Sequence, residues 1–220
     1  MTVAAPIYDS EGITIYNGSA FDLLPQLQAD VIVTDPPYGI AHPTDYHTRG
    51  RDKLAACSDY PPVFGDREPF DPGALLAVKV PTILWGANYF ADKLPTSSGW
   101  LVWDKMRPHT LDQATAELAW SNFVKGCRVF RHMWNGMIRA SERGRGVLVH
   151  PTQKPIALME WCLTLKWTPR GVVLDPFMGA GSTLLAARNL GRPAIGIEIS
   201  EQYCALAISR LENQGKEETK

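Results

Sequence analysis

Short apolar segments alternate along the chain with longer stretches that have helical periodicity. The segment at 31–34, Val-Ile-Val-Thr, is apolar enough for a strand that is buried on both faces, as strands of parallel sheets are. Six further segments have the length and composition of strands, at 13–16, 82–85, 100–103, 116–120, 172–174 and 194–199. This alternation predicts an α/β fold with a largely parallel sheet.

Three helices are predicted in the C-terminal part of the chain. In the segment 156–167, apolar side chains recur at the spacing of one helix face, at Ile156, Met159, Leu163 and Trp167. Helices are also expected at 181–190 and 201–211, before a polar tail at 212–220 that we expect to fray. With 220 residues, of which 45% are hydrophobic, the chain suits one compact domain over residues 1–220.

Two stretches do not follow this alternation. Residues 42–72 are polar and rich in turn-forming residues, and so long a loop within a domain is usually functional or mobile. Residues 125–145 carry one acidic residue, Glu142, and six basic ones. The basic residues are Lys125, Arg128, Arg131, Arg139, Arg143 and Arg145. A solvated surface would explain these charges, whereas a nucleic-acid contact would use them for phosphates and the nearby Trp134 and Asn135 for bases.

The overall charge excludes a uniformly basic protein. Lys and Arg number 22 and Asp and Glu 23, for a formal net charge of -1, so a nucleic-acid surface must be local. No Cys-x-x-Cys pair and no metal-ligand spacing of histidines occurs, so we expect reduced thiols and no metal. Residues 1–12 lack a secretion signal and no apolar run is long enough to cross a bilayer, which predicts a soluble intracellular protein.

Two predicted strands end in an aspartate followed by proline, at Asp35 and Asp175. In doubly wound α/β sheets, ligands bind at the carboxyl ends of the strands, where the strand order reverses. Two acidic strand ends therefore predict two ligands that meet in one crevice.

The segment at 175–183 is a glycine turn that leads directly into a helix. Its glycines allow a tight turn and a close approach of backbone to a ligand, and the Gly-Lys-Ser/Thr of a phosphate-binding loop is absent. Glu198, near the end of the next strand, is placed to accept both hydroxyls of a ribose. The combination predicts a nucleoside cofactor without a pyrophosphate. The candidate cofactor contacts in this turn are Asp175, Pro176, Phe177, Gly179, Gly181, Ser182 and Thr183.

The segment Asp35-Pro36-Pro37-Tyr38 has the composition of a binding site for an amino group. The amine of a nucleobase is a poor nucleophile, because its lone pair is delocalised into the ring. Two acceptors, the Asp35 carboxylate and the Pro36 carbonyl, can draw the nitrogen toward tetrahedral geometry and stabilise its developing charge. The two prolines stiffen the loop, and Tyr38 offers a face for stacking. For this motif alone, a stiff turn capped by Asp35 is the alternative.

Together these motifs resemble those of the amino-DNA methyltransferases, which use S-adenosylmethionine to methylate adenine N6 or cytosine N4. Asp35 to Tyr38 is similar to their catalytic motif, 175–183 to their cofactor loop and Glu198 to their ribose-binding acid. Residues 150–155 are similar to the segment that closes over the methionine end of the cofactor. This similarity implies cofactor contacts at His150, Thr152, Gln153 and Lys154. A solvated surface lysine is the alternative for Lys154.

The order of the motifs, catalytic before cofactor, is similar to that of the β group of this family. It implies a Rossmann-like methyltransferase fold with a mostly parallel seven-stranded sheet and a circularly permuted motif order. Where the family often has Gly-Asp near the cofactor's adenine, this chain has Asn17-Gly18-Ser19, so Ser19 or Asp22 takes that contact. The implied target-recognition insert, 121–149, is short. Recognition then concerns a very short site, or also uses the 42–72 loop or a second subunit of a homodimer.

The resemblance implies a site-specific DNA methyltransferase in the cytoplasm of a bacterium or encoded by a phage, typical of restriction-modification systems; whether it has a restriction partner stays open. Its partner would be double-stranded DNA from which the target base is flipped out. Aspartate at position 35 favours adenine N6, since serine is common there in cytosine enzymes. Cytosine N4 methylation stays open, as do a glutamine side-chain or RNA methyltransferase and a non-catalytic DNA-binding protein with the same fold.

Overall fold

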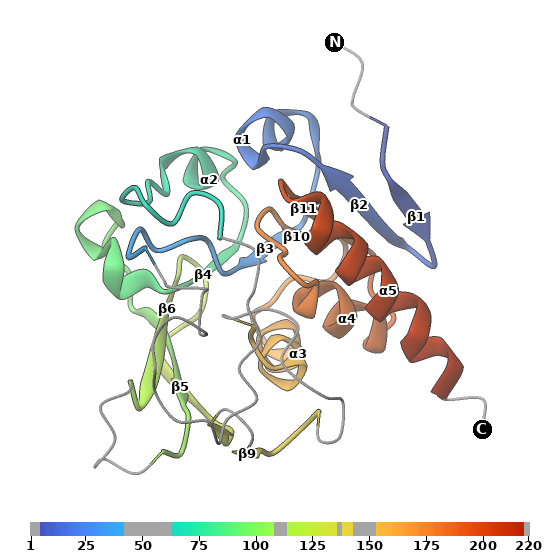
Figure 1. The fold of residues 1–220 in the computed structure, drawn as a ribbon. Helices are drawn as coiled ribbons and strands as arrows, with labels where there is room; N and C mark the ends of the chain where they lie inside the picture. Colours follow the sequence, from blue (N-terminus) through green and yellow to red (C-terminus); the bar gives the residue numbers. More distant parts are fainter. Residues whose placement is uncertain (1–4, 42–62, 108–113, 136–137, 143–152, 218–220) are drawn as a thin grey trace, which may run out of the picture.

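The computed structural model describes residues 5–41, 63–107, 114–135, 138–142 and 153–217 (Figure 1). Within these ranges, nine strands form the central sheet in the order β1-β2-β11-β10-β3-β4-β6-β5-β7. Their bounds are β1 Tyr8–Ser10, β2 Ile13–Asn17, β3 Val31–Thr34, β4 Thr82–Trp85, β5 Gly99–Asp104, β6 Ala116–Ser121, β7 Cys127–Arg131, β10 Val173–Asp175 and β11 Ala194–Glu198. A separate small sheet pairs β8 (Trp134–Asn135) with β9 (Ile138–Arg139).

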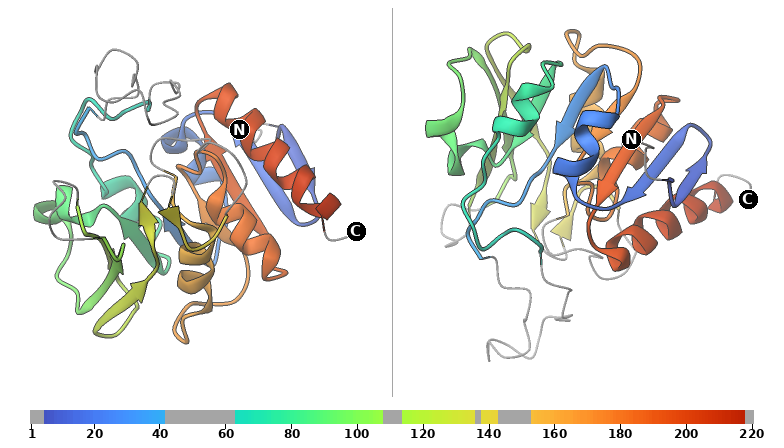
Figure 2. Two further views of the ribbon diagram at one scale, coloured as in Figure 1. Left: turned by 60° about the horizontal axis from the view of Figure 1, so that its bottom comes forward. Right: turned by 90° about the horizontal axis from the view of Figure 1, so that it is seen from above.

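Helices cover both faces of the central sheet (Figures 1 and 2). One core contains side chains such as Ile15, Val33 and Val173, together with those of α3, α4 and α5. The other contains the alternate strand positions, such as Ile32 and Leu174, with side chains of α1 and α2. The helices are α1 Ala20–Leu23, α2 Gly73–Ala77, α3 Ile156–Thr164, α4 Ser182–Asn189 and α5 Glu201–Glu217. Short 3₁₀ turns are η1 Leu24–Gln26, η2 Ala87–Tyr89 and η3 Ala91–Lys93.

The α/β fold expected from the sequence is confirmed, but the strand count is corrected. All seven predicted strands are present, whereas β1 and β7 at the two edges were not expected. β1 has three residues, too few for an alternation to be visible, and β7 is a largely exposed strand that contains two arginines. Two helix bounds also differ: α3 ends at Thr164 rather than at residue 167, and α5 continues to Glu217, into the segment we expected to fray.

The strand order reverses between β10 and β3. From β10 the chain passes through α4 to β11 on one side, and from β3 it passes through α2 to β4 on the other. All of these neighbouring strands are parallel, whereas β6 is antiparallel to both β4 and β5. The carboxyl ends of β10 and β3 therefore form the topological switch point at which ligands of such sheets bind. No helix in the described ranges has both the length and the apolar character needed to cross a membrane.

Candidate active site

The two aspartate motifs lie side by side at this switch point. Asp175 is the last residue of β10, and Asp35 directly follows β3, the parallel neighbour of β10. The Thr34 hydroxyl donates a hydrogen bond of 2.6 Å to Asp175 Oδ1, which joins the two strand ends. The crevice predicted from the two acidic strand ends is thus formed by directly adjacent strands.

The glycine turn after β10 is held against the end of β11. Gly179 has φ +50°, and its N–H donates to Glu198 Oε2 at 3.0 Å. The Ser200 N–H donates to Glu198 Oε1 at 2.8 Å. A carboxylate has roughly four acceptor positions, so Glu198 keeps capacity for two ribose hydroxyls. Because this half-buried side chain is already fixed by backbone donors, the residues present fit a nucleoside.

Gly181 closes this turn at the start of α4. It has φ +76°, and a Cβ added to it would lie 3.0 Å from Ala207 Cβ in α5. Phe177 is half-buried and forms edge contacts with Phe21 and Phe70, at centroid distances of 6.1 and 5.6 Å. Pro176, Ser182 and Thr183 are buried. The turn is therefore shaped by close backbone packing. Phe177, which we predicted to contact the cofactor, is half-buried.

The end of β2 adjoins the Glu198 region. The Asn17 side-chain amide donates to the Glu198 and Ile199 carbonyls, at 2.9 and 3.1 Å. The Gly18 N–H also donates to the Glu198 carbonyl, at 3.0 Å. Ser19, which we predicted to contact the cofactor, follows directly and is the N-cap residue of α1. Asn17 fixes the strand end that carries Glu198, a positioning role that the sequence did not reveal.

Asp175 is almost fully buried, with 3% of its surface exposed. Burial raises the pKa of its carboxyl to about 6, although hydrogen bonds from Thr183 and Thr34 counteract part of this effect. The unfolded chain, with the ordinary pKa of 3.8, releases this proton more readily than the folded chain. The folded state is therefore destabilised by this group as the pH rises from about 4 to about 6.

We expect Asp175→Asn to raise the free energy of unfolding at pH 7 by about 1–3 kcal/mol. Asparagine keeps an oxygen that can accept from Thr34 but carries no charge to desolvate. Urea unfolding of both proteins between pH 3.5 and 7 measures the effect. The two proteins share all other titrating groups. The difference between their free energies of unfolding should therefore be near zero at pH 3.5 and grow toward pH 6. A difference that does not depend on pH would contradict this account.

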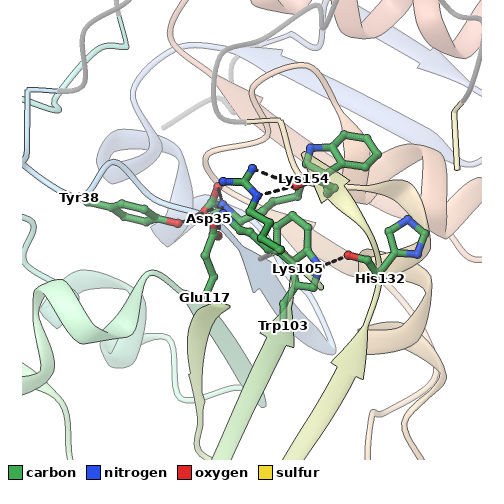
Figure 3. Close-up of polar contacts among 9 residues, drawn as sticks. Asp35, Tyr38, Trp103, Lys105, Glu117, His132 and Lys154 are labelled. Atoms are coloured by element: carbon green, nitrogen blue, oxygen red, sulfur yellow. Dashed lines mark hydrogen bonds and ion pairs between the residues drawn. The ribbon is translucent and has the colours of Figure 1, made fainter. Parts of the chain in front are cut away.

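Four charged side chains form a row that ends at Asp35 (Figure 3). Lys154 Nζ lies 2.5 Å from Asp35 Oδ2 and 3.0 Å from Glu117 Oε2. Lys105 Nζ lies 2.5 Å from Glu117 Oε1. The exposed fractions of these side chains range from 5% for Lys154 to 22% for Glu117. Lys105 and Glu117 are not among the predicted site residues; a charged residue within or beside an apolar strand is a signal that could have indicated them.

The charges in this row support one another's ionised forms. Burial raises the pKa of Asp35, and the Lys154 ammonium counteracts part of that rise. Burial also disfavours charge on Glu117, but Lys154 and Lys105 lower the pKa of its carboxyl to about 2. For Lys154, burial acts to lower the pKa, and Asp35 and Glu117 outweigh it, so the pKa is raised. The row therefore contains two cations and two carboxyl groups in alternation, with Glu117 the most strongly ionised acid.

Tyr38 also contacts this row. Its hydroxyl donates a hydrogen bond to Asp35 Oδ1 and lies 3.0 Å from Lys154 Nζ. Its ring stacks on that of Tyr89, with centroids 4.8 Å apart. The ring also lies against Gly86 at the end of β4, where an added Cβ would come within 1.9 Å of Tyr38 Cε1. Both Asp35 oxygens thus have donors in this structure, and an amine held by Asp35, as predicted, would have to replace one of them.

The backbone after Pro37 is held by one buried carboxylate. Asp66 Oδ1 accepts the N–H groups of Tyr38 and Gly39, at 3.0 and 2.9 Å. Asp66 is 5% exposed and belongs to the 42–72 stretch, of which residues 42–62 lie outside the described ranges. This part of the long loop therefore positions the predicted catalytic motif.

The segment that was expected to close over the cofactor is only partly described. His150 and Thr152 lie outside the described residues. The Gln153 amide donates to Glu142 Oε2 at 2.9 Å, and Glu142 Oε1 accepts the Ile156 N–H at the start of α3. Lys154 points into the row that ends at Asp35. Its cofactor contact stays a prediction, and the contacts that the structure shows are with Asp35 and Tyr38 of the predicted catalytic motif.

The basic stretch at 125–145 adds an exposed rim next to the sheet. Lys125, Arg128 and Arg131 are exposed; Arg128 lies over the Trp167 ring, and Arg131 pairs loosely with Asp104 at 3.5 Å. Arg139 lies over the ring of Trp134, which is 5% exposed and part of the core. The burial of Trp134 argues against the base contact that we expected of it. Arg143, Arg145 and the side chain of Asn135 are outside the described part of the chain.

Comparison with known proteins identifies the class that this fold and site define. The N6/N4 DNA methylase family model matches residues 96–209, more than half of the chain. The chain therefore belongs to this family of S-adenosylmethionine-dependent DNA amino-methyltransferases, whose members modify adenine N6 or cytosine N4.

Curated relatives align along nearly the whole chain. The Type II methyltransferase M.ScaI of Streptomyces caespitosus is 26% identical, over 96% of this chain and 85% of its own length. The Type II methyltransferase M2.LlaDCHI of Lactococcus lactis subsp. cremoris is 24% identical, over 96% of this chain and 93% of its own.

Solved structures support the fold. The M1.HpyAVI–SAM complex has a TM-score of 0.53 at 24% identity and covers 90% of this chain and 99% of its own. The cytosine-N4-specific PvuII DNA methyltransferase has a TM-score of 0.62 at 14% identity and covers 92% of this chain and 87% of its own.

Proposed function

We propose that this protein transfers a methyl group from S-adenosylmethionine to N6 of an adenine that is flipped out of double-stranded DNA. The observation that carries the proposal is the junction of the two strand-end motifs. Asp35, which would hold the amine, and Glu198, which would accept the ribose hydroxyls, lie at the carboxyl ends of β3 and β11, and a hydrogen bond from Thr34 to Asp175 joins β3 to the intervening β10. Donor and acceptor of the methyl group would meet there.

The cofactor would be held by the turn after β10 and by Glu198. Glu198 would accept the ribose hydroxyls, while the Asp175 turn, with Phe177 and Gly179, would line the rest of the nucleoside. Ser19, Gln153 and Lys154 are further candidates, as are His150 and Thr152. When bound, S-adenosylmethionine supplies a methyl group on a positively charged sulfur, which keeps the electron pair of the C–S bond as the N–C bond forms.

The target amine would be held by Asp35 and the Pro36 carbonyl. The amine replaces the Tyr38 hydroxyl on Asp35 Oδ1, so that one N–H points to Asp35 and the other to Pro36. These two acceptors stabilise the positive charge that develops on the nitrogen. After transfer the nitrogen releases one proton, which Asp35 accepts and passes to water. Tyr38, once freed from this hydrogen bond, offers its ring to the flipped base.

DNA would lie across the exposed basic rim. Lys125, Arg128 and Arg131 are candidates for phosphate contacts because they are exposed cations on and beside the edge strand β7. Residues 121–149 are the candidate recognition insert, and their small size favours a short target site. The curated relatives are Type II methyltransferases of bacteria, so we propose a role in a restriction-modification system. A homodimer, a cytoplasmic location and the absence of metal stay predictions.

The test is methylation of unmodified genomic DNA by the purified protein with S-adenosylmethionine. Digestion to nucleosides and mass spectrometry should show N6-methyldeoxyadenosine. N4-methyldeoxycytidine in its place would keep the reaction and correct the base, and the absence of any methylated DNA base would refute the proposed activity. Modification-aware sequencing of the same product then identifies the recognition site.

A further inference from the structure

Three oxygens surround the Lys154 ammonium. Lys154 Nζ donates hydrogen bonds to Asp35 Oδ2 at 2.5 Å and to the Tyr38 hydroxyl at 3.0 Å. Glu117 Oε2 lies 3.0 Å from Nζ and forms an ion pair with it. Since the side chain is 5% exposed, these contacts rather than water determine where the charge lies.

Glu117 is the part of this arrangement that does not touch Asp35. It lies on β6 and bridges two cations, Lys154 through one oxygen and Lys105 through the other. Lys105 follows directly on β5, the antiparallel neighbour of β6. The paired strands β5 and β6, together with the residues before α3, are thus tied to the loop that follows β3. Burying four charged groups costs desolvation free energy that hydrophobic residues at the same positions would avoid. Holding the strands together is therefore not a sufficient reason for these charges.

We propose that Glu117 is a positioning residue, which acts through Lys154 to hold Asp35 with one oxygen bound and the other directed to the substrate amine. The inference rests on the proposed function, since it assigns a task to Asp35. Lys154 neutralises Asp35 on the Oδ2 side, and Glu117 keeps Lys154 from moving across to Oδ1. Lys105 in turn prevents Glu117 from following Lys154.

Glu117→Gln tests the role because it keeps the shape and removes the charge. The charged and titratable groups around residue 117 would then be Lys105, Arg107, Lys154, Asp35 and Tyr38. Loss of the Glu117 anion lowers the pKa of Lys154. Because the proposed positioning of Asp35 needs the protonated form of Lys154, kcat should decline at high pH as Lys154 loses its proton. In Glu117→Gln this alkaline decline should begin at lower pH than in the wild type. At the optimum, kcat should fall on the order of 10²-fold, with the KM for S-adenosylmethionine unchanged.

Two further variants separate positioning from folding. Glu117→Asp keeps the anion and should keep the alkaline limb at its wild-type pH, even where kcat is reduced by the shorter side chain. Glu212→Gln, an exposed change near the end of α5, should leave both kcat and the pH profile unchanged. A Glu117→Gln protein with wild-type kcat, or with reduced kcat and an unmoved alkaline limb, would overturn the proposal.

A measurement that needs no turnover keeps the two proposals distinguishable. In protein with ¹³C-labelled lysine, the Lys154 resonance, assigned by its loss in Lys154→Arg, should titrate at lower pH in Glu117→Gln than in wild type. An unchanged Lys154 titration would refute the coupling even if the enzyme is active. A wild-type protein that methylates no DNA would refute the proposed function, whatever the titration shows.

Discussion

Replacement of Asp35 by alanine should abolish methyl transfer and leave the binding of S-adenosylmethionine largely intact. The substitution removes the carboxylate that would accept one N–H of the target amine, so the charge that develops on nitrogen loses its main stabilising partner. Loss of one such preorganised group costs on the order of 10²–10³-fold in kcat, and here the attacking group itself would also be misplaced. We therefore expect a fall of about 10³-fold or more.

The effect on cofactor binding should be small for a structural reason. Asp175 and Glu198, the candidate cofactor ligands, lie on β10 and β11 and keep their backbone partners without Asp35. Initial rates with labelled S-adenosylmethionine and isothermal titration with the cofactor analogue S-adenosylhomocysteine measure the two properties separately. Near-normal turnover in Asp35→Ala would refute the catalytic assignment.

Asp35→Asn is the matched variant for this experiment. It keeps one acceptor oxygen for the amine but loses the ion pair with Lys154. Its kcat should lie between those of the wild type and Asp35→Ala. A urea-unfolding curve for each variant shows whether loss of the Asp35–Lys154 ion pair also destabilises the fold, since Lys154 then keeps Glu117 as its anionic partner.

Glu198→Ala should weaken the binding of S-adenosylmethionine on the order of 10²-fold. Each hydrogen bond to a charged acceptor contributes about 1.5–3 kcal/mol, and every 1.4 kcal/mol changes the dissociation constant about tenfold. The variant also frees the Gly179 and Ser200 N–H groups that Glu198 holds, which loosens the turn that would line the nucleoside. Isothermal titration measures the dissociation constant.

Two controls sharpen this test. Glu201→Gln, an exposed change at the start of α5, should bind the cofactor as the wild type does. Glu198→Gln keeps one acceptor oxygen and should fall between wild type and Glu198→Ala. An unchanged dissociation constant in Glu198→Ala would remove Glu198 from the cofactor site. At saturating cofactor, Glu198→Ala should regain much of its kcat, which Asp35→Ala cannot do.

The inner strands were predictable because both of their faces are covered. In β3, all four residues are buried between helices on opposite sides of the sheet, so the sequence there is an unbroken apolar run. The edge strand β7 has an exposed face and an exposed edge, so arginine is tolerated within it and no apolar pattern is required. The two strands that the sequence did not predict, β1 and β7, are therefore the edge strands, where few positions must be apolar.

Helix ends depended on contacts beyond the local pattern. Trp167 has the spacing of the α3 face, yet α3 ends at Thr164, whose hydroxyl bonds back to the Glu160 and Trp161 carbonyls. Trp167 still packs against the core from the following loop, with Arg128 over its ring. Periodicity identified which side chain is buried there but not the backbone conformation that places it.

The family and the two strand-end motifs follow from the sequence by itself, because their chemistry lies in consecutive residues. Asp35-Pro36-Pro37-Tyr38 and the Asp175 turn contain their own stiffness, acceptors and glycines within a few positions. The row from Lys105 through Glu117 and Lys154 to Asp35 was decided only by the tertiary structure. Asp35 follows β3, Lys105 directly follows β5, Glu117 lies on the paired strand β6, and Lys154 precedes α3, so only the folded chain brings the four together. Interactions between such distant charges depend on distance and burial, which no local pattern of residues encodes.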